Sequence, residues 1–264
     1  MSAMRDNPVK TKLLAGGHAF GLFAMEFFTP GFPQIVKAAG AEFILFDMEH
    51  SAAGIDVMKN QIALCRGLGI VPLVRVPQAQ YHFIARLLDA GAMGIMVPMV
   101  ETVEQAELIV RSAHFPPTGR RGAAFGIAQD DYIGGSVPDK IAGAHERTLL
   151  MLQIETEKGL ANLDAIAAVP GFDSLWIGFL DLSNFLGVHG DYKHPKYLAA
   201  IDAIVAAGRK HHKVLGTAAP SEEFARDYYA KGFRMIAYGT DFTLLQSALS
   251  QRLQGLSTFA DGGS

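Results

Sequence analysis

Short apolar runs alternate with longer segments of helical periodicity along the whole chain, and this alternation constrains the fold more than any other feature. The runs predict eight strands, at residues 19–24, 43–48, 71–76, 94–98, 149–154, 174–177, 214–217 and 235–238. Apolar residues recur at helical spacing in 33–39, 57–67, 81–90, 103–112, 159–168, 195–211, 221–231 and 241–254. The 264 residues divided by eight give 33 per unit, the size of a strand, a helix and their two turns. The sequence therefore predicts a (β/α)8 TIM barrel that occupies residues 1–264 as a single domain.

The strand runs are apolar throughout rather than alternating, as in Ile44-Leu45-Phe46. Parallel strands covered on both faces have this pattern, and both a barrel and a doubly wound open sheet contain such strands. After the first run the chain reads FAMEFF at 23–28, where an open dinucleotide-binding sheet would carry a glycine-rich phosphate loop. The barrel is therefore favoured over the open sheet.

One segment breaks the rhythm of strand and helix. About thirty residues, 115–145, separate the fourth predicted helix from the fifth strand, and they are rich in glycine and proline. Long loops in compact domains are usually functional or disordered. Phe125, Tyr132 and Ile133 favour partial order for this one.

Charge and cysteine content exclude several classes of partner. The net charge is -3, and the sequence has no block of Lys and Arg long enough to follow a phosphate backbone, so we expect no nucleic-acid partner. No apolar run reaches about 18 residues and no signal-like core follows the N-terminal charges, so neither a membrane nor export is expected. The single cysteine, Cys65, lies in an apolar helical stretch, which favours a reducing cytoplasm.

Polar residues at strand ends are the candidates for chemistry, because barrel active sites form at the carboxyl ends of the strands. Glu155 ends the fifth run and Asp181 follows the sixth. Two carboxylates on neighbouring strand ends could hold one hard divalent cation and leave positions open for water and substrate. Each could instead cap the helix that follows it. Gly178 opens a short turn before Asp181 whose backbone N–H groups could bind a carboxylate.

Three other residues carry charge toward the same end of the barrel. His50 follows Asp47 and Glu49 and is a candidate general base, although a surface histidine without a role is the alternative. Arg75 lies within an apolar run, where its charge would be costly unless it faced an anion. Asp89 ends a predicted helix. A carboxylate at this position can be functional or simply solvated, and the sequence alone leaves both interpretations open.

Lys158 is the one lysine close to a strand end at which a candidate acid, Glu155, also lies. A Schiff base there is an alternative route to carbon–carbon chemistry. Its position in the first turn of a helix makes that reading the weaker one.

Taken together, the strand-end motifs resemble the HpcH/HpaI aldolase family. They are Asp47-x-Glu49-His50, Val74-Arg75-Val76, Leu87-Leu88-Asp89-x-Gly91, Val97-Pro98-Met99-Val100, Pro116-Pro117-x-Gly119-x-Arg121-Gly122, Gln153-Ile154-Glu155-Thr156 and Ile177-Gly178-x-x-Asp181-Leu182-Ser183. They occur in order and at compatible spacing, from about residue 12 to residue 253.

The resemblance implies a class II, metal-dependent pyruvate aldolase, a carbon–carbon lyase on a (β/α)8 barrel. By motif position, the implied metal ligands are Glu155 and Asp181, and the metal is Mg, Mn or Co. The implied substrate contacts are Gln153, Gly178, Thr217 and the backbone at Leu180 and Asp181. Arg75 would stabilise the enolate, and His50 would act as the catalytic base with support from Asp89.

The expected reaction is the reversible cleavage of a 4-hydroxy-2-oxo acid to pyruvate, or an analogue such as hydroxypyruvate, and an aldehyde. Decarboxylation of a keto acid such as oxaloacetate, and a barrel that only binds a partner, are the alternatives. The family is commonly hexameric, so the resemblance also implies a homohexamer whose last helix, 241–254, is exchanged between subunits.

The sequence departs from the family pattern at several loops. Phe179 replaces the usual proline after Gly178, and a bulky ring there could reshape the pyruvate pocket. The loops after His50, after Arg121 and after Thr217 also differ. These loops would face the aldehyde, so we expect them to determine which aldehyde the protein accepts.

Overall fold

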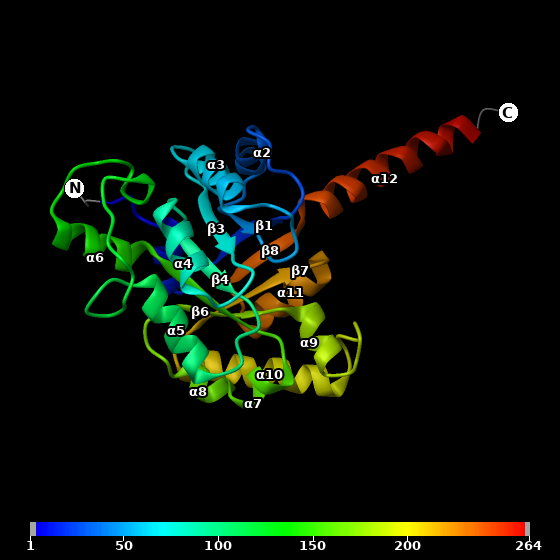
Figure 1. Cartoon of the computed structure of the whole chain (residues 1–264). Coiled ribbons are helices and arrows are strands. Elements are labelled where there is room, and N and C mark those ends of the chain that lie inside the picture. Colours follow the sequence, from blue (N-terminus) through cyan, green and yellow to red (C-terminus); the bar gives the residue numbers. More distant parts are fainter. Residues whose placement is uncertain (1–3, 262–264) are drawn as a thin grey trace.

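Eight parallel strands form a closed barrel in the computed structural model, which describes residues 4–261 (Figure 1). The strands are β1 (Ala19–Ala24), β2 (Phe43–Asp47), β3 (Val71–Arg75), β4 (Gly94–Val97), β5 (Leu149–Ile154), β6 (Ser174–Ile177), β7 (Val214–Ala219) and β8 (Met235–Thr240). Each strand pairs with the next in sequence, and β1 closes the ring by pairing with β8. The predicted (β/α)8 fold and all eight predicted strands are confirmed.

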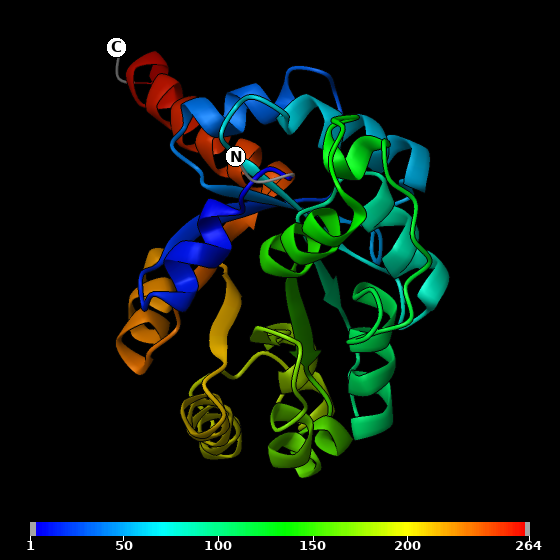
Figure 2. The same cartoon turned by 90° about the vertical axis from the view of Figure 1, so that its left-hand side faces the viewer.

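Helices surround the barrel, as the two views show (Figures 1 and 2). They are α1 (Pro8–Leu14), α2 (Phe32–Ala38), α3 (Ile55–Cys65), α4 (Tyr81–Asp89), α5 (Val103–Ala113), α6 (Val137–Arg147), α7 (Glu157–Ala161), α8 (Leu163–Ala167), α9 (Phe179–Phe185), α10 (Pro195–Lys210), α11 (Glu222–Lys231) and α12 (Asp241–Asp261). In the described part of the chain, no helix is long and apolar enough to span a membrane.

Local sequence accounts for several helix ends. The Thr102 side chain accepts from the Gln105 backbone and the Gln105 side chain accepts from the backbone at Thr102, which forms a capping box before α5. Ser221 caps α11 in the same position, and Gly232 ends that helix in the left-handed region, where glycine has no steric penalty.

Large side chains fill the inside of the barrel. Trp176 and Phe43 are almost fully buried there together with leucines and methionines from alternating strand positions. Gly216 faces the Trp176 ring so closely that a Cβ at this position would clash with it. The barrel is thus a packed core with its open space at the strand ends.

The structure adds helices that the sequence pattern did not predict. The long segment between α5 and β5 contains a 3-10 turn, Ala128–Asp130, and the helix α6. Buried polar contacts hold it: Lys140 Nζ lies 2.5 Å from an oxygen of Asp130 and also donates to the Ile133 carbonyl. The expected partial order is therefore confirmed. The predicted helix 159–168 is divided into α7 and α8 at Asn162, and α1 and α9 are additional.

The last helix leaves the barrel. In Figure 1, α12 projects away from the body of the molecule. Its leucines at 249, 253 and 256 are each more than half exposed.

Candidate functional site

The carboxyl ends of the strands surround a pocket of about 190 Å³. Residues from seven strands or the turns that follow them line it: Phe23, Met25, His50, Arg75, Gln153, Trp176, Ile177, Gly178, Phe179, Leu180, Asp181, Ala218 and Thr240. Most of the predicted site residues are therefore brought together. Trp176 and Phe23 meet edge to face, with ring centroids 6.1 Å apart, and form an apolar floor.

Arg75 is held in place by two carboxylates. Strand register sets Asp47 of β2 beside Arg75 of β3, and Asp47 accepts two hydrogen bonds from the guanidinium, at 2.7 and 2.8 Å. Glu49 Oε2 lies 3.1 Å from Arg75 Nη1. Burial acts to lower the pKa of Arg75, but the hydrogen bonds and charge of Asp47 outweigh it and leave that pKa raised. Arg75 is thus a fixed, permanently charged donor facing the pocket.

Glu155 is a buried carboxylate with few stabilising partners. One of its oxygens accepts from the backbone N–H of Met99 at 2.8 Å, and the other accepts from Gln153 Nε2. Burial raises the pKa of Glu155 to about 7, although these hydrogen bonds oppose the rise, and the charges of Glu49 and Asp181 add to it. The side chain is only 2% exposed, so its negative charge lacks compensation from solvent.

Glu49 is a second carboxylate whose pKa is raised by burial. Burial raises its pKa to about 7; Arg75 opposes the rise, and Asp47 and Asp181 add to it. Its Oε2 atom, and Oε1 of Gln153, are buried without a hydrogen-bond partner in the described chain. Asp181 thus contributes to the raised pKa of both Glu49 and Glu155, and carboxylates gathered in this way are oxygen donors of the kind that Mg²⁺ and Mn²⁺ prefer.

The donor set fits a divalent cation at Glu155 and Asp181. Within residues 4–261 no three His, Cys, Asp or Glu side chains already form a complete metal cluster. Two protein carboxylates would leave the remaining coordination positions to water and substrate, which suits a catalytic rather than a structural site.

Gly178 is required for this arrangement. A Cβ at this position would clash with Glu155 Oε2 and would come within 2.7 Å of Gln153 Nε2. Leu182 N makes the first intrahelical hydrogen bond of α9, to Gly178 O at 2.8 Å, so the N–H groups of residues 179–181 have no partner within the helix. These N–H groups are available to an anion in the pocket.

His50 lies at the mouth of the pocket. Its side chain is 53% exposed, and Nε2 is 3.7 Å from Glu49 Oε2. The backbone N–H of His50 donates to Asp47 at 3.1 Å, which fixes the turn after β2. The imidazole can therefore reach both solvent and substrate.

Two predicted residues lie away from the pocket. Asp89 is the last residue of α4, whose course back from β3 carries it to the opposite end of the barrel, where Asp89 pairs with Arg121 at 2.5 Å. No contact in the described chain joins it to His50, so its support of the base stays a prediction. Thr217 is fully buried and its hydroxyl donates to the Ala218 carbonyl at 3.0 Å; Ala218 lines the pocket instead.

Asp47 and Glu49 both contact Arg75, and sequence reasoning gave them no role of their own. The signal for Asp47 is its place at the end of the second strand, because neighbouring parallel strands in register set it beside Arg75. Lys158 lies outside the pocket, is 60% exposed and pairs with Glu101 at 3.1 Å.

Comparison with known proteins identifies the family of the chain. The sequence model of the family described as HpcH/HpaI aldolase/citrate lyase matches residues 20–248. The chain belongs to this family. Membership makes it an aldolase-type carbon–carbon lyase.

Relatives and solved structures cover nearly the whole chain. A hydroxypyruvate/pyruvate aldolase of Delftia acidovorans is 38% identical over 242 residues, 92% of this chain and 89% of that protein. A 5-keto-4-deoxy-D-glucarate aldolase of Klebsiella pneumoniae is 35% identical and covers 81% and 83%. The structure of an HpcH/HpaI aldolase from Desulfitobacterium hafniense superposes with a TM-score of 0.89 at 28% identity, covering 94% and 96%.

Proposed function

We propose that the protein is a divalent-metal-dependent aldolase that reversibly cleaves 4-hydroxy-2-oxo acids to pyruvate, or a close analogue such as hydroxypyruvate, and an aldehyde. The observation that carries the proposal is the buried carboxylate of Glu155, whose pKa is raised by burial and by the nearby charge of Asp181, beside the pocket that Asp181 and Arg75 line. The family and the names of the relatives support the reaction class.

The pocket can orient a 2-oxo acid. The free N–H groups at Leu180 and Asp181 would bind its carboxylate. Gln153, whose Oε1 is buried without a partner, lies beside the same position. Gly178 leaves space for the substrate's carboxylate end.

Cleavage of the C3–C4 bond leaves negative charge on the C2 oxygen. A cation held by Glu155 and Asp181, for which Mg²⁺, Mn²⁺ or Co²⁺ is proposed, would act there as a Lewis acid. Arg75, fixed by Asp47, would donate to the same oxygen as charge develops. His50 would take the proton of the C4 hydroxyl and return it in the synthetic direction.

The absence of lysine from the pocket lining supports the metal-dependent route. None of the residues that line this pocket is a lysine, and the ammonium of Lys158 is directed to Glu101. A Schiff-base mechanism needs an amine within reach of the substrate carbonyl.

The experiment measures pyruvate release by the purified protein from a panel of 4-hydroxy-2-oxo acids. The proposal expects cleavage of at least one member of the panel and the reverse condensation with its aldehyde. Decarboxylation of oxaloacetate without cleavage of any member would favour the keto-acid decarboxylase instead.

Assembly is a second part of the proposal. A largely apolar groove of about 620 Å³ lies beside the base of α12, between α2, β1 and β8, and is lined by residues such as Phe32, Ile35 and Leu245. In a closed barrel this is where the helix after β8 would pack, but α12 projects away (Figure 1). We propose that α12 of a neighbouring copy fills this region, within a homohexamer.

The proposed setting is the cytoplasm, with small keto acids and aldehydes as partners and neither nucleic acid nor membrane. The single cysteine, Cys65, is free and buried, which is consistent with a reducing compartment.

A further inference from the structure

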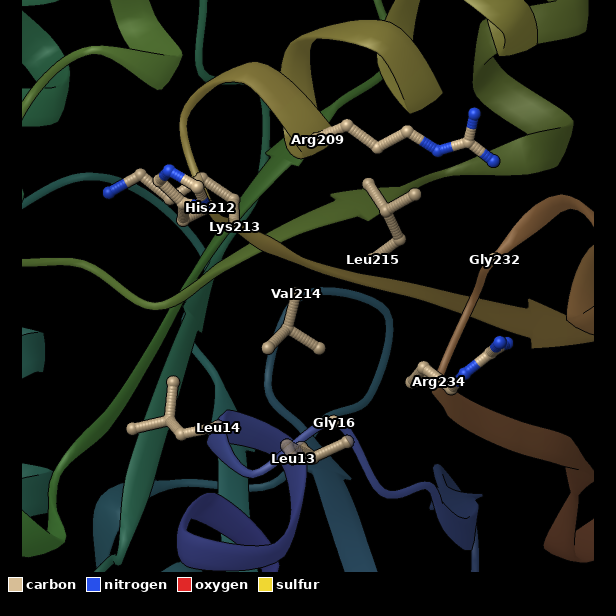
Figure 3. Close-up of a pocket in the computed structure, with 10 residues that line it drawn as sticks. All are labelled: Leu13, Leu14, Gly16, Arg209, His212, Lys213, Val214, Leu215, Gly232 and Arg234. Atoms are coloured by element: carbon tan, nitrogen blue, oxygen red, sulfur yellow. The ribbon is translucent and has the colours of Figure 1, made fainter.

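Figure 3 shows a second pocket, of about 220 Å³. Its lining residues precede or begin strands, so it lies at the amino-terminal end of the barrel, opposite the catalytic pocket. It is formed where α1, the ends of α10 and α11, and the starts of β7 and β8 meet. Its lining is apolar at Leu13, Leu14, Val214 and Leu215, with Gly16 and Gly232 beside them, and basic at Arg209, His212, Lys213 and Arg234. None of the lining residues is acidic, although the chain as a whole has a net charge of -3.

One of these basic groups is already engaged. Lys213 Nζ donates to the carbonyls of Val169 at 3.1 Å and Phe172 at 2.9 Å, and it lies over the Phe172 ring. In Figure 3, Lys213 lies on one side of the pocket and the guanidinium groups of the two arginines lie on the other. Lys213 therefore contributes its stem to the pocket more than its charge.

The two arginines differ from Lys213. Arg234 uses Nη1 to donate to the carbonyls of Tyr229 and Phe233, at 2.9 and 3.0 Å, and its guanidinium lies over the Tyr229 ring, 4.4 Å from the ring centroid, which leaves the Nε and Nη2 donors at the edge available. The guanidinium of Arg209 has no hydrogen-bond or ion-pair partner among residues 4–257, whose side chains the structure describes, and a Cβ at Gly232 would lie 4.0 Å from its Nη2. In Figure 3 both guanidinium groups lie on the same side of the pocket, with Gly232 between them.

Helix ends do not neutralise this charge. The carboxyl termini of α1, α10 and α11 all reach this pocket, and each carries about half a negative charge, so together they offset about one and a half of the two arginine charges. A nearby carboxylate, Asp202, shares a neighbouring hollow with Arg209 and lies 3.9 Å from Lys231. Net positive charge therefore remains at the rim.

We propose that this pocket binds a small organic oxyanion whose charged group bridges Arg209 and Arg234 and whose short hydrocarbon part lies on Leu13 and Val214. Guanidinium groups bind carboxylate and phosphate through paired, charge-assisted hydrogen bonds. The apolar floor favours an organic anion over a fully hydrated inorganic one, and the volume limits it to a small molecule. The site is separate from the catalytic pocket, which lies at the other end of the barrel.

The test titrates the intact, metal-loaded protein with succinate and, separately, with inorganic phosphate, at constant ionic strength, by calorimetry and thermal unfolding. At ten times the dissociation constant, binding to the native state raises Tm by about 3 °C. Arg209→Gln lowers the affinity at least about tenfold, because it removes one charge-assisted contact. Arg226→Gln is the matched control, since Arg226 is an exposed arginine of α11 that pairs with Glu222.

Succinate could also enter the catalytic pocket, so Arg75→Ala is included. Succinate binding that survives Arg75→Ala but weakens in Arg209→Gln supports the proposal. If phosphate binds instead of succinate, and Arg209→Gln but not Arg75→Ala weakens that binding, the site is assigned to phosphate compounds. Absence of binding by both anions, or binding that Arg209→Gln leaves unchanged, overturns it.

Discussion

Replacement of Glu155 by Gln should make the metal-free protein more stable at neutral to alkaline pH. The fold raises the pKa of Glu155 from 4.5 to about 7, and the buried side chain has no solvent to screen its charge. A carboxyl with a raised pKa stabilises the fold fully below its unfolded pKa, and this contribution is lost as pH rises through the folded pKa. Above the folded pKa the loss of folding free energy is complete. The rise in pKa from 4.5 to about 7, at 1.36 kcal/mol per pH unit, makes this loss about 3 kcal/mol.

The substituted amide can satisfy its surroundings. Its oxygen can keep the hydrogen bond from Met99 N, and its nitrogen can donate to Gln153 Oε1 once the Gln153 amide turns over. Glu155→Gln should therefore raise Tm by about 6 °C at about pH 8 in the presence of chelator. At about pH 5 the stability difference should shrink to about 0.8 kcal/mol, because Glu155 is then largely protonated in the fold.

Thermal and urea unfolding at both pH values measure this difference. Glu157→Gln, which changes an exposed carboxylate nearby, should alter stability by less than about 1 kcal/mol. Mn²⁺ should stabilise the parent protein and leave Glu155→Gln unchanged. Equal or lower stability of Glu155→Gln at about pH 8, or a difference that does not depend on pH, would refute the reasoning.

Three further predictions test other parts of the site and the assembly. Arg75→Ala should lower kcat by about 100-fold or more while Mn²⁺ affinity, measured by calorimetry, changes little; recovery of activity when the variant is stabilised by osmolyte would make Arg75 structural. Gly178→Ala should weaken Mn²⁺ binding because its Cβ displaces the Glu155 carboxylate, and unchanged affinity would contradict the close approach. Leu249→Glu with Leu253→Glu should give a smaller species by light scattering, whereas an unchanged mass would exclude α12 from the interface.

The barrel could be predicted because its signal is repeated. Eight buried parallel strands read as eight apolar runs, and each strand lies within two residues of its predicted bounds. The helix α6 was missed because Gly134, Gly135 and Pro138 around its start resemble a loop. Its order depends on contacts such as Lys140 with Asp130, which no local pattern contains.

The site could be predicted only in part. Glu155, Asp181, Arg75 and His50 lie at strand ends or just after them, so topology alone brings them to one end of the barrel. The hydrogen bonds between Asp47 and Arg75 depend on the register of β2 and β3. The position of Asp89 in the fold depends on the direction of α4. The order of motifs along the sequence specifies neither the strand register nor the direction of a helix.

Metal dependence of cleavage tests the central claim most directly. Pyruvate release from the best 4-hydroxy-2-oxo acid should be lost after complete removal of divalent metal and restored by Mn²⁺ or Mg²⁺, and borohydride with substrate should leave the protein active. Cleavage that persists without metal, together with inactivation by borohydride at Lys158, would contradict the account.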